Sequence, residues 1–465
     1  MFNMDPERAK RRQSIKVIVS ESIMVLTVII MVTVLGFLVS GYWINTNFQI
    51  ERQGLLQISS IPTGADVSID GEEGSWFQRT NTSKVLSSGR HTVTLTKEGY
   101  DSWSKTINIS EGLLYRIHYP RLFLNERKKE NVLDASNTDL ATMSPEHNYL
   151  LLINKTTDWR LINLEDEEIK EKIISVANLF QNADTISSEI LEINWDKDSN
   201  HILLKIKTND NLEWILLDIQ NQENSINLTK EFSSNFSDIE IIDNSSNNLL
   251  AIKNNNLHKI NIPSKTLSSV LVENIVNFDH YNNEIIFSAK NQSDTDTPKY
   301  YLGTSQTSSD KITKIEDFDN PFVPRISKFY EDKYITILSK NTISLYKKED
   351  FVKLSDFELS FSPEHIKVGH NGEFIIAYSG NRIATLDMES MSITEWSTDG
   401  SKFGWLDDDM IYSVSDGDLI VYDYDGFNRR VVANNASSDF PVGITDNKWL
   451  YYFSDSELVR EYLTK

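Results

Sequence analysis

The chain has 465 residues, with 46 Lys and Arg against 68 Asp and Glu, and a formal net charge of −22. Its length allows two or three domains with ample cores. A surface this acidic repels the phosphate backbone, so we expect no nucleic-acid partner. The absence of cysteine excludes disulfides, Cys-ligated zinc, iron–sulfur clusters, a thiol nucleophile and a lipid-modified cysteine.

An uncharged apolar run near the N-terminus predicts a transmembrane helix over residues 17–44. The run extends for 22 residues from Ile23 to Ile44, and a helix of that length spans about 33 Å, close to the ~30 Å hydrocarbon core of a bilayer. A cleavable signal peptide fits less well, because its apolar region is shorter, at about 7–15 residues, and ends in small residues. The predicted anchor residues are Ile23, Leu26, Ile29, Ile30, Leu35, Phe37, Leu38, Tyr42 and Trp43.

The charges that flank this run predict its orientation. Residues 1–16 contain two acidic residues and five basic residues, Arg8, Lys10, Arg11, Arg12 and Lys16. After the run, Glu51 and Arg52 cancel. The positive-inside bias therefore predicts a single-pass protein of the cell membrane, with a cytoplasmic tail over residues 1–16 and everything after the helix outside the cytoplasm. Tyr42 and Trp43 then lie at the outer interface, where amphipathic rings are enriched.

After a polar spacer over residues 45–54, residues 55–124 have the pattern of a small β domain. Threonines at 92, 94 and 96 alternate with Val93 and Leu95, and alternation with a period of two indicates half-buried strands. Gly, Pro and Asp punctuate the strands at residues 61–64, 69–71, 88–89 and 98–100, as turns require. We expect antiparallel strands here.

The same residues resemble the PEGA domain, a small β-sandwich of bacterial and archaeal envelope proteins. The resemblance rests on the run from Ser59 to Gly71, on Gly89–Leu95 and on residues 98–100. The turn that names the family consists here of Pro62, Thr63, Gly64 and Ala65, so the family's Glu is replaced. Membership would imply an envelope location and no catalytic residues. We expect His91 to pack or form hydrogen bonds within the sandwich.

A repeat begins after the polar residues 125–130. A polar turn followed by an apolar pair recurs about every 40–45 residues, which is the period of a four-stranded propeller blade. The apolar positions are Leu150-Leu151, Ile202-Leu203, Leu249-Leu250, Ile285-Ile286, Ile335, Ile375-Ile376, Ile411-Tyr412 and Leu450-Tyr451. The recurring turns lie at residues 145–148, 196–200, 279–283, 369–373 and 407–409.

Eight repeats predict a β-propeller of seven or eight blades over residues 138–465, preceded by a connector over residues 125–137. Residues 144–146 and 361–364 are similar to the Ser-Pro-Asp-Gly turns of TolB-type and WD40-like propellers. We expect the strand over residues 458–462 to close the ring by pairing with residues near 131–140, because closure removes exposed strand edges. The expected fold class is therefore an all-β ectodomain, a sandwich plus a propeller, on one N-terminal transmembrane helix.

Motifs for catalysis are absent from the sequence. There is no His-Glu-x-x-His, no Gly-x-Ser-x-Gly and no phosphate-binding Walker loop. His365 and His370 are five residues apart and on one strand would face opposite sides, which disfavours a shared metal. Oxygen-rich turns suit Ca²⁺ but equally form ordinary hairpins. The weak candidates for a metal site are Asp416, Asp418, Asp423 and Asp425.

These observations favour a non-enzymatic protein without a cofactor. We expect a membrane-anchored extracytoplasmic binding or scaffold protein of the bacterial envelope, whose propeller presents a binding face to an envelope protein, a peptide or a cell-wall glycan. One alternative is a propeller hydrolase or lyase acting on envelope polysaccharide, since carboxylates from distant blades can meet in one funnel. The other is an envelope sensor that signals through the transmembrane helix. We expect most tryptophans of the repeats to pack between sheets.

Overall fold

The computed structural model describes residues 6–39, 42–44, 50–73, 79–165, 168–180, 189–208, 211–242, 247–291 and 299–464. The chain divides into two compact units, Met1–Asn125 and Glu126–Lys465. The second unit begins within the predicted connector, a few residues before its first strand.

The first unit begins with helix α1 (Pro6–Val39). Its segment Val19–Phe37, with a mean hydropathy of 2.2, is long and apolar enough to cross a membrane, a property that anchors and signal sequences share. The anchor residues within this segment are all exposed: Ile23, Leu26, Ile29, Ile30, Leu35 and Phe37. Leu38 is also helical, as are the basic residues from Arg8 to Lys16, but their side chains lie outside the described residues.

The helix ends five residues before the predicted boundary. Tyr42 and Trp43, expected in the membrane helix, instead belong to strand β1 (Tyr42–Ile44), which pairs with residues 50–52 of β2 (Ile50–Ile58). Gly41 has a low helix propensity, and the aromatic and β-branched residues after it favour strands. The apolar run therefore combines a helical part with a strand of the following domain.

Two four-stranded sheets make up the rest of the first unit. In one, β2 lies between β5 (Thr82–Ser87) and the parallel strand β8 (Leu114–Ile117), with β1 as a further neighbour. The other has the order β4 (Glu72–Glu73), β3 (Asp66–Ile69), β6 (Gly89–Thr96) and β7 (Trp103–Ile109). The two sheets contribute fully buried side chains to the interior, including Leu56, Ile58, Val93, Leu95 and Trp103.

Hydrogen bonds fix the turns of this unit. The Thr80 hydroxyl accepts a bond from the Ala65 N–H at 3.0 Å, and the Ser60 hydroxyl donates to the Pro62 carbonyl at 2.7 Å. His91 packs with only 12% of its side chain exposed and places Nδ1 2.7 Å from a carboxylate oxygen of Asp70. The prediction that His91 has a structural role is confirmed.

The second unit contains eight four-stranded antiparallel sheets among its described residues. We call them blades 1–8 in chain order. Blade 1 contains β10 (Leu140–Met143), β11 (Tyr149–Ile153), β12 (Asp158–Asn163) and β13 (Lys170–Ser175). Blade 2 contains β14 (Glu189–Trp195), β15 (His201–Thr208), β16 (Asn211–Asp218) and β17 (Ile226–Asn227). Blade 3 contains β18 (Asp238–Ile241), β19 (Asn248–Lys253), β20 (Asn256–Asn261) and β21 (Thr266–Leu267). Blade 4 contains β22 (Ile275–Tyr281), β23 (Glu284–Lys290), β24 (Tyr300–Gln306) and β25 (Ser309–Phe318).

The remaining blades follow the same plan. Blade 5 contains β26 (Val323–Phe329), β27 (Asp332–Ser339), β28 (Thr342–Lys347) and β29 (Lys353–Glu358). Blade 6 contains β30 (His365–Val368), β31 (Phe374–Ser379), β32 (Arg382–Asp387) and β33 (Ser392–Ser397). Blade 7 contains β34 (Phe403–Trp405), β35 (Met410–Ser415), β36 (Asp418–Asp423) and β37 (Arg430–Ala433). Blade 8 contains β38 (Gly443–Thr445), β39 (Trp449–Ser454), β40 (Glu457–Tyr462) and β9 (Lys129–Asp134). Short helices η1 (Ala177–Leu179), η2 (Gln222–Asn224) and α2 (Leu228–Glu231) complete the unit.

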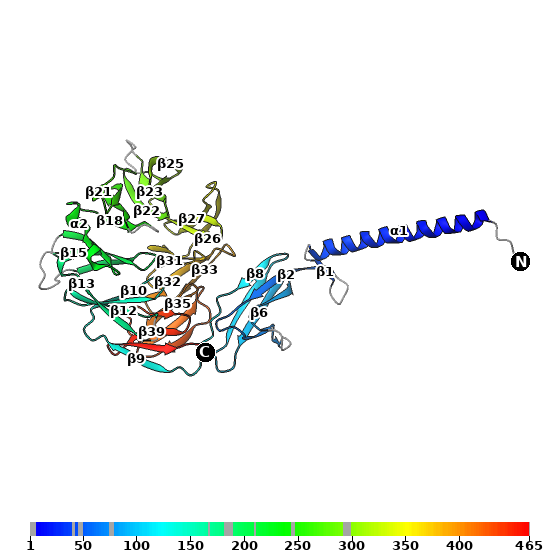
Figure 1. Cartoon of the computed structure of the whole chain (residues 1–465), viewed down its shortest axis with the longest axis horizontal. Helices are drawn as coiled ribbons and strands as arrows, with labels where there is room; N and C mark the ends of the chain where they lie inside the picture. The colour runs from blue at the N-terminus through cyan, green and yellow to red at the C-terminus, as the bar shows by residue number, and fades with distance from the viewer. Residues whose placement is uncertain are drawn as a thin grey trace. The chain divides into compact units, whose positions relative to one another are not determined.

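The ring is closed by the first strand of the unit. β9 pairs antiparallel with β40, so the last blade combines strands from both ends of residues 126–465. Figure 1 shows β9, in cyan, at the red end of the chain, where β40 lies between it and β39. The unit is a β-propeller of eight blades, and each apolar position of the repeat lies in the second strand of its blade. The closing strand falls within the predicted connector, at the start of the predicted pairing region.

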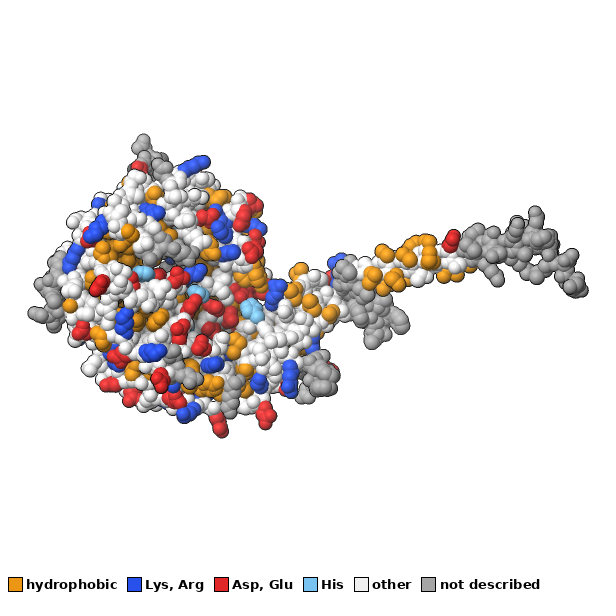
Figure 2. Space-filling model, in the orientation of Figure 1, with side chains coloured by type: hydrophobic (Ala, Val, Ile, Leu, Met, Phe, Trp, Pro, Cys, Tyr) orange, Lys and Arg blue, Asp and Glu red, His pale blue; other side chains and the backbone are white. Residues whose placement is uncertain are grey.

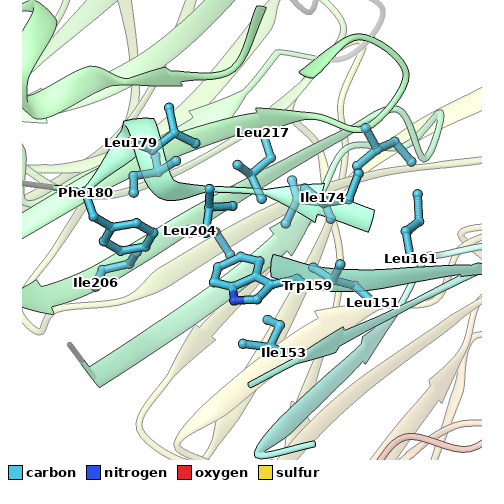
Figure 3. Close-up of a cluster of buried hydrophobic side chains, with 14 residues drawn as sticks. Leu151, Ile153, Trp159, Leu161, Ile174, Leu179, Phe180, Leu204, Ile206 and Leu217 are labelled. Carbon is cyan, nitrogen blue, oxygen red and sulfur yellow. The ribbon is translucent and has the colours of Figure 1, made fainter. Parts of the chain in front are cut away.

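Buried side chains join neighbouring blades. Trp159 of β12 is fully buried in a cluster that combines residues of blades 1 and 2, including Leu151, Leu204 and Leu217 (Figure 3). Trp214 is fully buried in the equivalent cluster between blades 2 and 3. These two tryptophans confirm the expectation of packing between sheets.

A partly buried ion pair fixes the turn between β14 and β15. His201 Nδ1 lies 2.8 Å from Asp196 Oδ2, and the other oxygen of Asp196 accepts the backbone N–H groups of Asn200 and His201. The hydrogen bond to Asp196 raises the pKa of His201. Because this pKa is higher in the folded than in the unfolded chain, the stabilisation is complete below pH ~6.5 and is lost as pH rises through the folded-state pKa.

Replacing Asp196→Asn tests this sign, since asparagine keeps the acceptor for the two backbone groups and removes the charge. We expect the free energy of unfolding to fall by about 1–2 kcal/mol at pH 6 and by clearly less at pH 9. Denaturant titrations at the two pH values measure the difference. An equal loss of unfolding free energy at the two pH values would show that the charge of His201 does not contribute to stability.

Candidate functional site

Two adjoining pockets of the propeller form the candidate site. Their walls come mainly from the first strands of blades 1, 4, 5, 6, 7 and 8 and from the turns that follow these strands. Elements from so many blades meet only around the axis of the ring, so we call the combined space the axial channel. Figure 2 shows acidic, basic and histidine side chains gathered near the middle of this face of the propeller.

The larger pocket has a volume of about 800 Å³ and lies between blades 4, 5 and 6, with Lys197 from blade 2. We call it the basic pocket, because its charged lining residues are four cations and two carboxylates. The cations are Lys197, Arg325, Lys328 and Lys367, and the carboxylates are Asp279 and Glu364. His280, His365 and His370 also line it.

Asp279 joins two blades at the wall of the basic pocket. Its Oδ2 accepts the N–H of Ile326 in blade 5 at 2.9 Å, and its Oδ1 accepts the N–H of His280 at 2.9 Å. Burial raises the pKa of the Asp279 carboxyl, whereas the neighbouring Arg325 acts in the opposite direction. Both oxygens of this carboxyl are thus engaged by the protein's own backbone.

The smaller pocket, of about 660 Å³, lies between blades 6, 7, 8 and 1. We call it the acidic pocket, because Glu146, Asp407 and Asp408 face a single cation, Lys367, among its lining residues. Burial raises the pKa of Asp408, and the charges of Asp407, Glu373 and Glu146 add to the rise, while His370 opposes it. The two pockets share Lys367, Val368 and His370, so they lie next to each other.

His147, which lines the acidic pocket, contacts the backbone of Ile444. His147 Nδ1 lies 3.3 Å from both the carbonyl oxygen and the N–H nitrogen of Ile444 in blade 8. Burial lowers the pKa of His147. The ring is therefore neutral near pH 7, and the acidic pocket gains no positive charge from it.

Several buried polar atoms along the channel have no hydrogen-bond partner among the described residues. They are His280 Nδ1 and Ser327 Oγ in the basic pocket and Trp405 Nε1 in the acidic pocket. The His280 side chain is only 8% exposed, and Ser327 is 3% exposed. Buried polar groups in native proteins are nearly always satisfied by protein, water or ligand. Water or a ligand can supply the hydrogen bonds that these atoms lack.

The structure does not bring the four calcium candidates together. Asp416 lies in the turn before β36 and Asp418 begins that strand, whereas Asp423 ends it and Asp425 follows. A strand of this length separates its ends by about 17 Å, which is too far for one ion. Asp416 and Gly417 both have positive φ, at +52° and +85°, and form the tight hairpin turn that Asp-Gly pairs favour.

His365 and His370 line the same pocket, although the sequence predicted that they would face opposite sides. His365 begins β30 and His370 lies after the strand has ended at Val368. The alternation of faces therefore does not extend to His370, and both residues line the basic pocket. We assign them no shared metal.

The repeat itself contained the signal for the site. Glu146, His147, Lys197, Asp407 and Asp408 all belong to the turns that preceded the apolar pairs in the sequence. Because every blade repeats the same path, equivalent turns lie on the same face of the ring. Arg325 and Ser327 had no such signal, since no turn was recognised in the fifth repeat.

Comparison with known proteins concerns the first unit most directly. Its two-sheet sandwich and the turn at Pro62–Ala65 are the decisive observations. Residues 53–120 match the PEGA domain family. The PEGA domain thus includes the core strands of the sandwich and leaves α1 and the propeller outside the match. Among curated proteins, none matches the chain.

Solved structures resemble the chain only distantly. An oligogalacturonate lyase in complex with manganese is 12% identical, with a TM-score of 0.42, over 73% of this chain and 98% of that chain. The lyase of that name from Vibrio parahaemolyticus is 12% identical, with a TM-score of 0.36, over 58% and 88%. Hsv2 of Kluyveromyces lactis is 10% identical, with a TM-score of 0.42, over 64% and 98%. With TM-scores below 0.5, these likenesses support no assignment of function.

Proposed function

We propose that the chain is a membrane-anchored, extracytoplasmic binding protein of the cell envelope, and that its axial channel binds a glycan. The observation that carries this proposal is the channel itself, whose two pockets are each within the size range of small-ligand sites, roughly 300–1,000 Å³. Pockets of this size suit a few sugar units rather than a folded partner. The PEGA match and the apolar segment of α1 agree with an envelope location.

The lining of the channel favours a sugar over an apolar ligand. The basic pocket combines the hydroxyl and amide groups of Ser327, Asn277 and Asn371 with the ring of Tyr281, and the acidic pocket adds the ring of Trp405. Such a combination hydrogen-bonds to sugar hydroxyls and packs against the apolar faces of sugar rings. A peptide that binds on the rim of the propeller would leave these groups unused.

Protease treatment of intact cells tests the location. We expect an added protease to degrade residues 126–465 in whole cells and to leave the N-terminal tail protected. Protection of the propeller in whole cells, with degradation only after permeabilisation, would reverse the orientation and remove the envelope assignment.

Glycan capture tests the binding function. The full chain in detergent should retain oligosaccharides from envelope digests, and Trp405→Ala should weaken retention about tenfold because stacking is lost. Trp195→Ala, a tryptophan outside the two pockets, is the matched control. Retention that is equal in both variants would place binding outside the channel.

A second candidate function is cleavage of the bound glycan. The observation that favours it is the meeting of Glu146, Asp407 and Asp408 in one pocket, with a raised pKa at Asp408. A carboxyl in a pocket with a raised pKa is a candidate general acid. New reducing or unsaturated ends in the retained glycans, lost in Asp408→Asn while retention persists, would assign the enzyme function.

A further inference from the structure

The basic pocket has an excess of positive charge in a strongly acidic protein. It contains two more cations than carboxylates, whereas the chain as a whole has a net charge of −22. Lys197 and Lys367 have no carboxylate within 4 Å among the described residues, and Lys328 has only a distant one, Glu331 at 3.8 Å, whose side chain is 98% exposed. The protein's own acids therefore leave these cations largely uncompensated.

Arg325 is held in place without being neutralised by a direct salt bridge. Its Nη1 donates to the Asn277 side-chain oxygen at 3.2 Å and to the Pro324 carbonyl at 2.9 Å, both of which are neutral acceptors. Two carboxylates, Asp279 and Asp238, interact with its charge without a direct salt bridge, and Asp279 uses both oxygens for backbone N–H groups. A planar guanidinium fixed in this way has further N–H groups available for a bidentate contact.

Independent support comes from the unpartnered atoms of the same wall. His280 Nδ1 and Ser327 Oγ are buried, line the basic pocket and have no hydrogen-bond partner among the described residues. The other ring nitrogen of His280 lies 3.7 Å from Glu240, beyond hydrogen-bond distance. An imidazole N–H and a hydroxyl O–H next to a guanidinium are the donors that an oxyanion accepts.

We propose that the basic pocket binds an oxyanion group, a carboxylate or a phosphate, on the glycan taken up by the axial channel. This proposal rests on the proposed function. Lys197, Arg325 and Lys367 supply the positive charge, and His280 and Ser327 supply directed hydrogen bonds. The acidic pocket beyond Lys367 repels anions, so the charged group of the ligand points toward blades 4–6 and its neutral part extends toward blades 7, 8 and 1.

Calorimetric titration of the full chain in detergent tests this proposal. The probes are oligomers of glucuronic acid, phosphorylated oligomers of glucose, unmodified oligomers of glucose and a poly-glutamate peptide of matched charge. We expect one of the two acidic sugars to bind at least tenfold more tightly than the neutral sugar, with an affinity that falls as salt is added. Preference for the uronate identifies a carboxylate ligand, and preference for the phosphorylated sugar identifies a phosphate ligand.

Paired variants localise the effect. Lys197→Gln combined with Lys367→Gln should lower the affinity for the preferred acidic sugar by ten- to a hundredfold, and that for the neutral sugar much less, so that the preference for the acidic sugar shrinks. The control combines Lys207→Gln and Lys311→Gln, which remove the same charge from exposed positions outside both pockets. Ser327→Ala, which retains the positive charge, should lower the affinity several-fold.

The outcomes separate this proposal from the function on which it rests. Equal binding of acidic and neutral sugars, with a loss of both in Trp405→Ala, would retain the glycan channel and overturn the oxyanion site. Binding of poly-glutamate alone would overturn the glycan proposal as well. Equal losses in the channel pair and the control pair would show that only the overall charge matters, and would overturn the site.

Discussion

Replacing Glu461→Leu should lower the free energy of unfolding of the propeller by about 3–5 kcal/mol, because it leaves the largely buried Arg127 without the Glu461 carboxylate. Glu461 Oε2 lies 2.9 Å from Arg127 Nε, and the two side chains are only 10% and 18% exposed. Its other oxygen accepts the hydroxyl of Tyr452 at 2.7 Å, and burial together with this bond raises the pKa of Tyr452. Denaturant titration monitored by tryptophan fluorescence measures the loss.

The position of this pair explains why the effect should be large. Arg127 precedes the closing strand β9, and Glu461 lies on β40, so the two residues are 334 positions apart and meet only when the ring is closed. Loss of the pair therefore weakens the one junction that no short loop supports. Opening there exposes the unpaired edges of two strands, which closed rings avoid.

A double variant separates the pair from the cavity. Adding Arg127→Met to Glu461→Leu removes the arginine's charge as well, and we expect it to recover most of the lost stability, as apolar replacements of buried pairs do. Glu331→Leu, at a side chain that is 98% exposed, should change stability by less than about 0.5 kcal/mol. If the double variant is no more stable than Glu461→Leu alone, the charge of Arg127 is not the cause of the lost stability.

The sequence predicted the architecture well because the propeller is repetitive. Each of the eight apolar positions, from Leu150-Leu151 to Leu450-Tyr451, lies in the second strand of a blade. Burial on both faces of these strands requires apolar runs, and the ring repeats that requirement once per blade. The closing strand was also anticipated, since an unpaired C-terminal strand needs a partner.

The start of the first unit was harder to predict. Residues 42–44 continue the uncharged run of the helix, and the absence of charge alone does not distinguish a membrane-spanning residue from a strand residue. The pairing of β1 with β2 ends the helix early and depends on a tertiary contact. The predicted transmembrane helix was therefore too long, because it included residues 42–44, which form strand β1.

The candidate site depended on information that no single repeat contains. His147 and Lys197 are ordinary turn residues within their own blades, and Arg325 lies on a strand without any motif. They line one channel because the ring brings equivalent positions of distant blades to its axis. A search by motif requires residues close in sequence, so it finds nothing here. An alignment of the repeats, followed by a comparison of the charges at equivalent turns, would have separated the residues of the acidic pocket from those of the basic pocket.

The contact between blades 1 and 2 provides the second large effect. Trp159→Ala should lower the free energy of unfolding by about 3–5 kcal/mol, because the indole is fully buried and its removal leaves a cavity. The ring packs edge-on against Phe180, with centroids 6.4 Å apart, and lies among leucines and isoleucines of both blades (Figure 3). Its Nε1 also donates to the Thr156 carbonyl at 3.1 Å, a bond that ties the ring to the turn before β12.

Trp159→Phe distinguishes the cavity from the hydrogen bond. Phenylalanine retains most of the apolar volume and loses the donor to Thr156, so we expect a smaller loss of about 1–2 kcal/mol. Hydrogen exchange should report the position of the damage, with amides of β12 and β15 losing protection while those of blade 5 keep theirs, because blades contact mainly their neighbours. Uniform loss of protection around the ring would show instead that the eight blades unfold as one cooperative unit, and the stability of each interface would then depend on every other.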